Sequence, residues 1–142
     1  MVEKLREIYE RYDVDGAEPR PTSFGEAFKG WFTGKGRGMS EVDETFAAEA
    51  RECVKEISES GEPGDALEAV KIIFSRPQTK KFSQRDLMFA AMHSLAAELV
   101  PKLNEAELQE ALASMDGVPK QYRFPVYKDA REQIKARLGE LS

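Results

Sequence analysis

The sequence predicts an all-α fold, a compact single-domain bundle of five to six amphipathic helices joined by short loops. Apolar residues recur at spacings of three and four along successive segments, which is the period of a helix with one buried face. Residues that begin or end helices stand between these segments, and no segment alternates apolar and polar residues as a half-buried strand does. The length of 142 residues suits one domain, and no linker composition divides residues 1–142.

The first helix is expected over residues 2–13, where one apolar stripe comprises Val2, Leu5, Ile8, Tyr9 and Tyr12. Turn and helix-breaking residues follow, the last of them Pro21. Ser23 and Glu26 then form a capping box, in which each side chain bonds to a backbone amide of the other residue. We expect a short second helix there, which ends at the glycines that start with Gly34.

Ser40 is the expected N-cap of a helix over residues 40–60, because three acidic residues occupy its first turn, where the helix dipole favours them. The inward stripe of this helix comprises Val42, Phe46, Ala50, Cys53, Val54 and Ile57. Asp65 and Glu68 repeat the capping pattern. Asp65 should therefore cap a shorter helix that ends near Ser75.

The next helix should begin at the N-cap Ser83 and continue to a break or kink at Pro101. It is apolar on most faces, through Leu87, Met88, Phe89, Ala91, Met92, Leu95, Ala96 and Leu99. A helix that is apolar nearly all round lies in the middle of a bundle. We therefore expect this one to be the central helix, with Met92 and Leu95 among the most buried residues.

Two further helices are expected towards the C-terminus. Asn104 and Glu107 form a capping box for a helix that should end at Asp116, with Gly117 as a left-handed C-cap. The last helix follows Pro125, and its apolar face carries Tyr127, Ala130, Ile134, Leu138 and Leu141.

The composition limits the chemistry that the chain can perform, because it holds one histidine, His93, and one cysteine, Cys53. These cannot supply a disulfide or the paired Glu-x-x-His motifs of a di-iron bundle, and we expect no metal and no cofactor. His93 is expected to be a core residue bonded to a backbone carbonyl. Cys53 should be a buried small hydrophobe with a raised thiol pKa. The carboxylates are expected on polar faces or at caps.

The net charge of −5 argues against binding to nucleic acid or to an anionic membrane. No segment approaches the roughly 20 apolar residues that span a bilayer, and the N-terminus lacks the apolar run of a signal peptide. A cytoplasmic location is therefore expected. Basic residues in the loop 76–81 and over 120–137 are interpreted as solvated surfaces, although aromatic residues are interleaved in the second group.

A glycine-rich segment that begins at Gly34 and leads into Ser40 is a candidate anion-binding site, with Lys35 and Arg37 between its glycines. Glycines allow the backbone to approach a ligand, and the amides at a helix N-terminus bind anions. The spacing does not match a Walker A loop or a dinucleotide-binding motif. The alternative is a solvated turn, which the acidic residues after Ser40 favour.

The segment before these glycines carries more aromatic surface than a two-turn helix can bury on one face. Phe28, Trp31 and Phe32 are therefore candidate partner-binding residues. The leading interpretation is a non-enzymatic protein-binding or regulatory domain, whose partner is another protein or a second copy. The alternatives are a small-anion or nucleotide-phosphate binder that uses the loop 34–40, and an enzyme with a carboxylate-based site.

Overall fold

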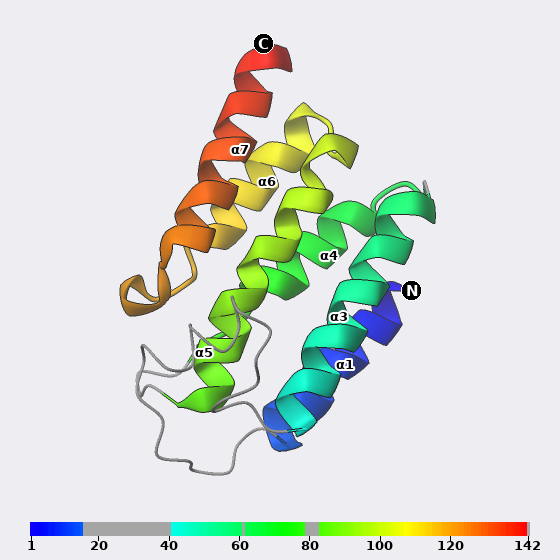
Figure 1. Ribbon diagram of the computed structural model, residues 1–142. Helices are drawn as coiled ribbons and strands as arrows, with labels where there is room; N and C mark the ends of the chain where they lie inside the picture. Colours follow the sequence, from blue (N-terminus) through cyan, green and yellow to red (C-terminus); the bar gives the residue numbers. More distant parts are fainter. Residues whose placement is uncertain (16–40, 61, 79–82, 142) are drawn as a thin grey trace.

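A computed structural model describes residues 1–15, 41–60, 62–78 and 83–141 of the chain, and these residues are mostly helical with no strand among them (Figure 1). The α-helices are α1 (Val2–Asp15), α3 (Glu41–Ser60), α4 (Asp65–Phe74), α5 (Gln84–Ala91), α6 (Glu105–Met115) and α7 (Pro125–Leu141). Three 3₁₀ segments join them: η1 (Met92–Glu98), η2 (Val100–Lys102) and η3 (Lys120–Tyr122). The predicted all-α helical bundle is confirmed.

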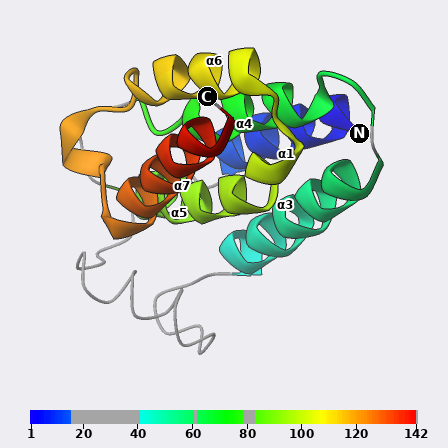
Figure 2. The same cartoon turned by 90° about the horizontal axis from the view of Figure 1, so that it is seen from above.

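The helices form a bundle around the segment made by α5 and η1. Helices α1 and α3 lie side by side and antiparallel, and α4 packs on α1, on α6 and on η1 (Figures 1 and 2). Helix α7 packs on α6 and on η1. The buried side chains of all these elements make one continuous apolar cluster. Met92 and Leu95 are both buried in it, which confirms the central position of their segment.

Aromatic rings from three elements join α1 to the rest of the bundle. Tyr12 stacks on Phe46 of α3 with 4.1 Å between ring centroids, and Tyr9 stacks on Phe89 of α5 at 5.5 Å. Rings of one pair meet rings of the other edge to face, namely Tyr9 with Phe46, Tyr12 with Phe89 and Phe46 with Phe89, so the four rings form a single cluster. Stacked and edge-to-face rings contribute about 0.5–1.5 kcal/mol per pair beyond the area that they bury. This cluster fixes how α1 sits against α3 and α5.

Two of the expected helix caps are present and one prediction is wrong. The Ser83 hydroxyl accepts a hydrogen bond from the Asp86 amide at 3.1 Å, and both bonds of the capping box between Asn104 and Glu107 are formed. Asp65 does not cap α4, because it is already the first helical residue and Gly64 precedes it with a φ of 84°. The left-handed backbone of Gly64 turns the chain into α4 where a side-chain cap was expected.

The end of α6 also differs from the prediction, because Gly117 is not left-handed. The Gly117 amide instead donates to the Ser114 carbonyl at 3.2 Å, and the Val118 amide donates to the Met115 carbonyl at 3.1 Å. These bonds tighten the last turn towards 3₁₀ geometry, which satisfies carbonyls that a left-handed cap would otherwise satisfy. Val118 still folds back and is buried, as expected.

The central helix was predicted to be one regular α-helix up to Pro101. It instead changes to 3₁₀ geometry at Met92. The Ser94 hydroxyl donates to the Ala91 carbonyl at 3.1 Å, and a serine that bonds back to the preceding turn competes with the backbone amide for that carbonyl. Further on, the Leu99 amide bonds to the Ala96 carbonyl three residues earlier. The segment nevertheless continues in the direction of α5 (Figure 1).

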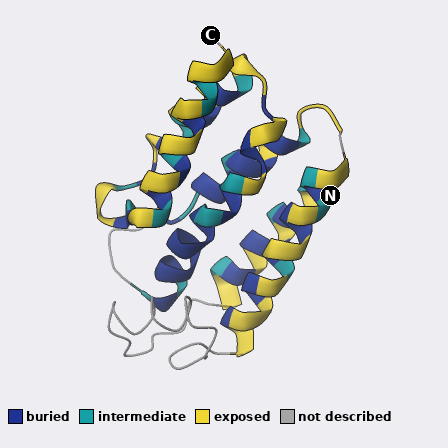
Figure 3. Cartoon of the chain, turned by 45° about the horizontal axis from the view of Figure 1, so that its top comes forward, coloured by how far each residue is buried: buried dark blue, intermediate teal, exposed yellow. Residues whose placement is uncertain are grey.

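Two apolar residues predicted to face inward are exposed. Val42 in the first turn of α3 is 39% exposed, and Leu141, the last residue of α7, is 41% exposed. The C-terminal end of α7 is mostly exposed (Figure 3). Asp43 takes the inward position beside Val42 and is 1% exposed. None of the helices in the described ranges is long and apolar enough to cross a membrane.

Candidate functional site

The six residues selected from the sequence as candidate sites lie outside the described residues. They are Lys35, Arg37 and Ser40 for an anion, and Phe28, Trp31 and Phe32 for a partner. Both assignments therefore stay predictions. The structure does describe the two helix ends that flank this part of the chain, Asp15 of α1 and Glu41 of α3, and two features of interest lie there.

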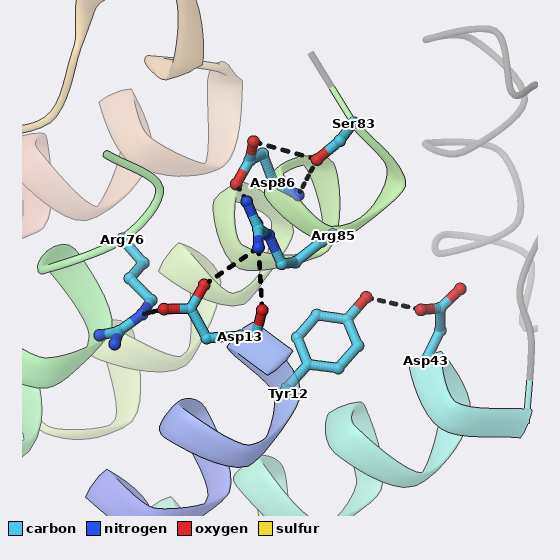
Figure 4. Close-up of polar contacts among 7 residues, drawn as sticks. All are labelled: Tyr12, Asp13, Asp43, Arg76, Ser83, Arg85 and Asp86. Atoms are coloured by element: carbon cyan, nitrogen blue, oxygen red, sulfur yellow. Dashed lines mark hydrogen bonds and ion pairs between the residues drawn. The ribbon is translucent and has the colours of Figure 1, made fainter. Parts of the chain in front are cut away.

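The first feature is a polar junction between the C-terminal end of α1, the N-terminal ends of α3 and α5, and the chain after α4 (Figure 4). Its members are Tyr12, Asp13, Asp43, Arg76, Ser83, Gln84, Arg85 and Asp86. Asp43, Gln84 and Asp86 are buried, although none of the three was expected in the bundle interior. The junction brings together residues that are up to 74 positions apart in the sequence, from Tyr12 to Asp86.

Asp43 is one of two buried carboxylates of the junction, the other being Asp86. The Tyr12 hydroxyl donates to one carboxylate oxygen at 2.5 Å, and the Gln84 side-chain amide donates to the other at 3.2 Å. Buried charges persist in proteins when such donors replace water. The expectation that acidic residues lie only on polar faces or at caps is therefore wrong for Asp43. One signal was present in the sequence, since Asp43 shares helical spacing with Phe46 and Ala50.

Asp13 is a further acidic residue of the junction and binds two arginines. Its carboxylate contacts the Arg76 Nε at 3.1 Å and the Arg85 guanidinium at 3.5 Å, and Arg85 also donates to the Asp13 carbonyl at 2.8 Å. Cations at a helix C-terminus are favourable because they meet the negative end of the helix dipole. Arg76 and Arg85 thus bind the end of α1, whereas Lys80 and Lys81 of the same basic loop lie outside the described residues.

The second feature is a pocket of about 240 Å³ between α1 and α3, beside the junction, which we call the α1–α3 groove. Buried apolar and aromatic side chains contribute to it from both helices, namely Ile8, Tyr12 and Phe46. Its exposed lining comprises Arg11, Asp15, Glu41, Val42 and Thr45. The groove therefore combines an apolar floor with a charged rim.

The charges on this rim do not balance. Arg11 is paired with Glu49 across the two helices, so its charge is already compensated. Asp15 and Glu41 have no ion-pair partner in the part of the chain that the structure describes. Asp15 also stands at the C-terminus of α1, where the last turn contains no basic residue and the dipole disfavours negative charge. One end of the groove is consequently acidic.

Three buried ionisable side chains have pKa values that burial moves away from neutral pH. Burial lowers the pKa of His93 to about 4, although its bond to the Arg76 carbonyl acts in the opposite direction. Burial raises the pKa of Cys53 and that of Tyr9. The expected core role of His93 is confirmed, since its Nε2 lies 2.9 Å from that carbonyl. The prediction for Cys53 is confirmed as well.

The C-terminal basic residues do not form an aromatic stacking surface. Tyr122, Phe124 and Tyr127 are buried, and the Tyr127 hydroxyl donates to the Met115 carbonyl. Arg123 lies over the Tyr127 ring and donates to the carbonyls of Asp116 and Val118, which follow α6. The rings that could stack on bases thus belong to the core, in agreement with the interpretation of this group as an ordinary charged surface.

Among the described residues, no three His, Cys, Asp or Glu side chains are grouped so that they could hold a metal ion. Comparison of the chain with protein-family models, with curated proteins and with solved structures finds no match. A function must therefore be argued from the residues of this chain.

Proposed function

We propose that this chain is a non-enzymatic protein-binding domain, and that the α1–α3 groove receives an apolar side chain of its partner. The observation that carries the proposal is the groove itself, in which Val42 is 39% exposed beside a floor made by Ile8 and Phe46. Pockets of this kind, apolar at the centre and polar at the rim, hold the anchor residues that dominate many protein interfaces.

The size of the groove supports a side chain as its occupant. Pockets that bind cofactors and other small molecules usually enclose about 300–1,000 Å³. The α1–α3 groove encloses about 240 Å³, and the three other pockets described are of similar size or smaller, from about 160 to 250 Å³. A pocket of this volume suits one large side chain that projects from a partner.

The polar junction supports a structural role for its carboxylates rather than the carboxylate-based enzyme considered as an alternative. Asp43 bonds to Tyr12 and Gln84, and Asp13 bonds to Arg76 and Arg85. Each of these contacts joins two elements of the fold. The junction thus shapes one end of the groove and keeps α1 and α3 at a fixed separation.

The test is a comparison of two substitutions of the same kind. Val42→Gln places a polar side chain in the groove, whereas Val14→Gln makes the same change at a residue of α1 that is 75% exposed and does not line the groove. Exposed substitutions of this type change stability by no more than about 0.5 kcal/mol. Tagged wild-type protein and both variants are used to isolate partners from an extract of the source cells, and the retained proteins are quantified by mass spectrometry.

We expect a partner that the wild type and Val14→Gln retain equally and that Val42→Gln loses. Circular dichroism spectra and melting curves confirm that both variants are folded. A partner set that is identical for all three proteins would show that the groove does not bind protein.

A further inference from the structure

The charge around the α1–α3 groove restricts the kind of partner that fits it. The apolar floor is the same for any hydrophobic anchor, but the rim is acidic at the end formed by Asp15 and Glu41. At the other end, Arg11 is neutralised by Glu49. A cation beside the anchor of the partner would meet carboxylates that form no ion pair with any described residue, and an anion there would meet like charge.

The end of α1 shows that cations are favourable at this place. Arg85 donates to the Asp13 carbonyl, and both Arg76 and Arg85 contact the Asp13 carboxylate, so the chain supplies its own cations on the inner side of the helix end. On the groove side, Asp15 forms no ion pair within the described residues, and the last turn of α1 contains no basic residue. A guanidinium or ammonium group from outside would complete the same arrangement.

The shape of the groove favours a helical partner. From Ile8 to Asp15 it extends along α1 for about 10 Å at 1.5 Å per residue. Two antiparallel helices form its walls, and an amphipathic helix that lies in such a groove presents anchors one turn apart. An anchor between Ile8 and Phe46 then places the next turn of the partner at the acidic end.

We propose that the partner of the α1–α3 groove is a basic amphipathic helix of another protein, with a large apolar anchor on Ile8, Val42 and Phe46 and an arginine or lysine one turn away at Asp15 and Glu41. This inference rests on the proposed protein-binding function and specifies the chemistry of the partner. A second copy of this chain is the competing occupant.

The experiment uses two fluorescein-labelled helical peptides of about 14 residues, or four turns. They share one apolar face with a central tryptophan and differ in that the lysines of one are glutamates in the other. Each is titrated with the full chain and followed by fluorescence anisotropy. We expect the basic peptide to bind more tightly, and its affinity to fall as sodium chloride is added, because salt screens exposed charges.

Two double variants separate the groove from the overall negative charge of the protein. The double variant Asp15→Asn, Glu41→Gln should lower the affinity for the basic peptide about three- to tenfold, as expected for the loss of two exposed ion pairs. Asp129→Asn with Glu132→Gln makes the same change of charge on the exposed face of α7 and should leave the affinity unchanged. Val42→Gln should lower the affinity for both peptides.

Equal affinity for the two peptides, no binding of either, or the same loss in both double variants would overturn the inference. A dimer in sedimentation velocity that Val42→Gln dissociates would also overturn it, since a second copy would then occupy the groove. If both peptides bind equally and Val42→Gln weakens both, the proposed function stands and the basic partner is wrong. If Val42→Gln has no effect on any binding, the proposed function itself fails.

Discussion

His93 should make the stability of the protein depend on pH in a predictable direction. The imidazole is fully buried, and its Nε2 must carry the proton, because the Arg76 carbonyl at 2.9 Å can only accept a hydrogen bond. Nδ1 has no hydrogen-bond partner within the described part of the chain. Protonation of Nδ1 would therefore create a buried cation with an unpaired N–H group, which explains why burial lowers the pKa to about 4.

The sign and size of the effect follow from this lowered pKa. Between its ordinary pKa of 6.5 and about 4, the unfolded state binds a proton at His93 that the folded state does not bind. The stabilisation is therefore complete above pH 6.5, is lost progressively as the pH falls towards 4, and does not change further below that value. At about 1.4 kcal/mol per pKa unit, the full loss is about 3 kcal/mol.

The matched variant is His93→Gln, whose side-chain amide can donate to the Arg76 carbonyl but does not titrate. We expect the free energy of unfolding of the wild type to fall relative to that of His93→Gln by about 2 kcal/mol between about pH 7 and pH 4.5. Urea unfolding followed by circular dichroism measures both proteins at each pH. The variant loses the ring contacts with Phe74 and Tyr127, so the change with pH is the quantity to compare rather than the stability at one pH.

A constant difference between the two proteins across this pH range would refute the reasoning. The other ionisable groups are present in both proteins, so their contribution cancels in the difference. An independent reading comes from the His93 proton resonances, which should show no protonation of the folded protein at about pH 5.5.

Two further substitutions test the fold. Leu95→Ala removes a buried side chain from η1 and should lower the free energy of unfolding by about 2–5 kcal/mol through lost burial and a cavity, whereas a loss below about 0.5 kcal/mol in urea unfolding would contradict its central position. Gly64→Ala should lower the free energy of unfolding by about 1–2 kcal/mol, because the φ of 84° is unfavourable for alanine. The added Cβ would meet no atom within 4 Å, so the cost would come from the backbone alone. A neutral result in the same assay would contradict that backbone conformation.

The features that depend on neighbouring residues could be predicted from the sequence. The capping box of Asn104 and Glu107 is one example, because both partners lie within one turn and no other part of the chain is needed to form it. The position of His93 was predictable for a similar reason, since the helix that carries it is apolar on nearly every face. The predicted helix start was wrong where backbone geometry decides it, as at Gly64, because the sequence does not reveal a φ angle.

The candidate site could not be predicted, because its parts come from distant positions. Asp43 resembles an ordinary acidic residue of a first helical turn until α1 brings Tyr12 beside it and α5 brings Gln84. The same pairing of α1 with α3 leaves Val42 partly exposed, although its spacing matches the buried stripe. A pattern along one helix gives the direction of its apolar face but not where the neighbouring helix ends.

The bond between Tyr12 and Asp43 has a consequence for how this protein tolerates change in length. It fastens the last turn of α1 to the first turn of α3, so a direct bond between side chains holds together the two helix ends that residues 16–40 connect. The entropy of closing a connection grows slowly, by about 0.6 kcal/mol for each doubling of its length. A change in the length of the connection between α1 and α3 would therefore cost little in closure entropy, and the bond between Tyr12 and Asp43 would still hold the two helix ends together.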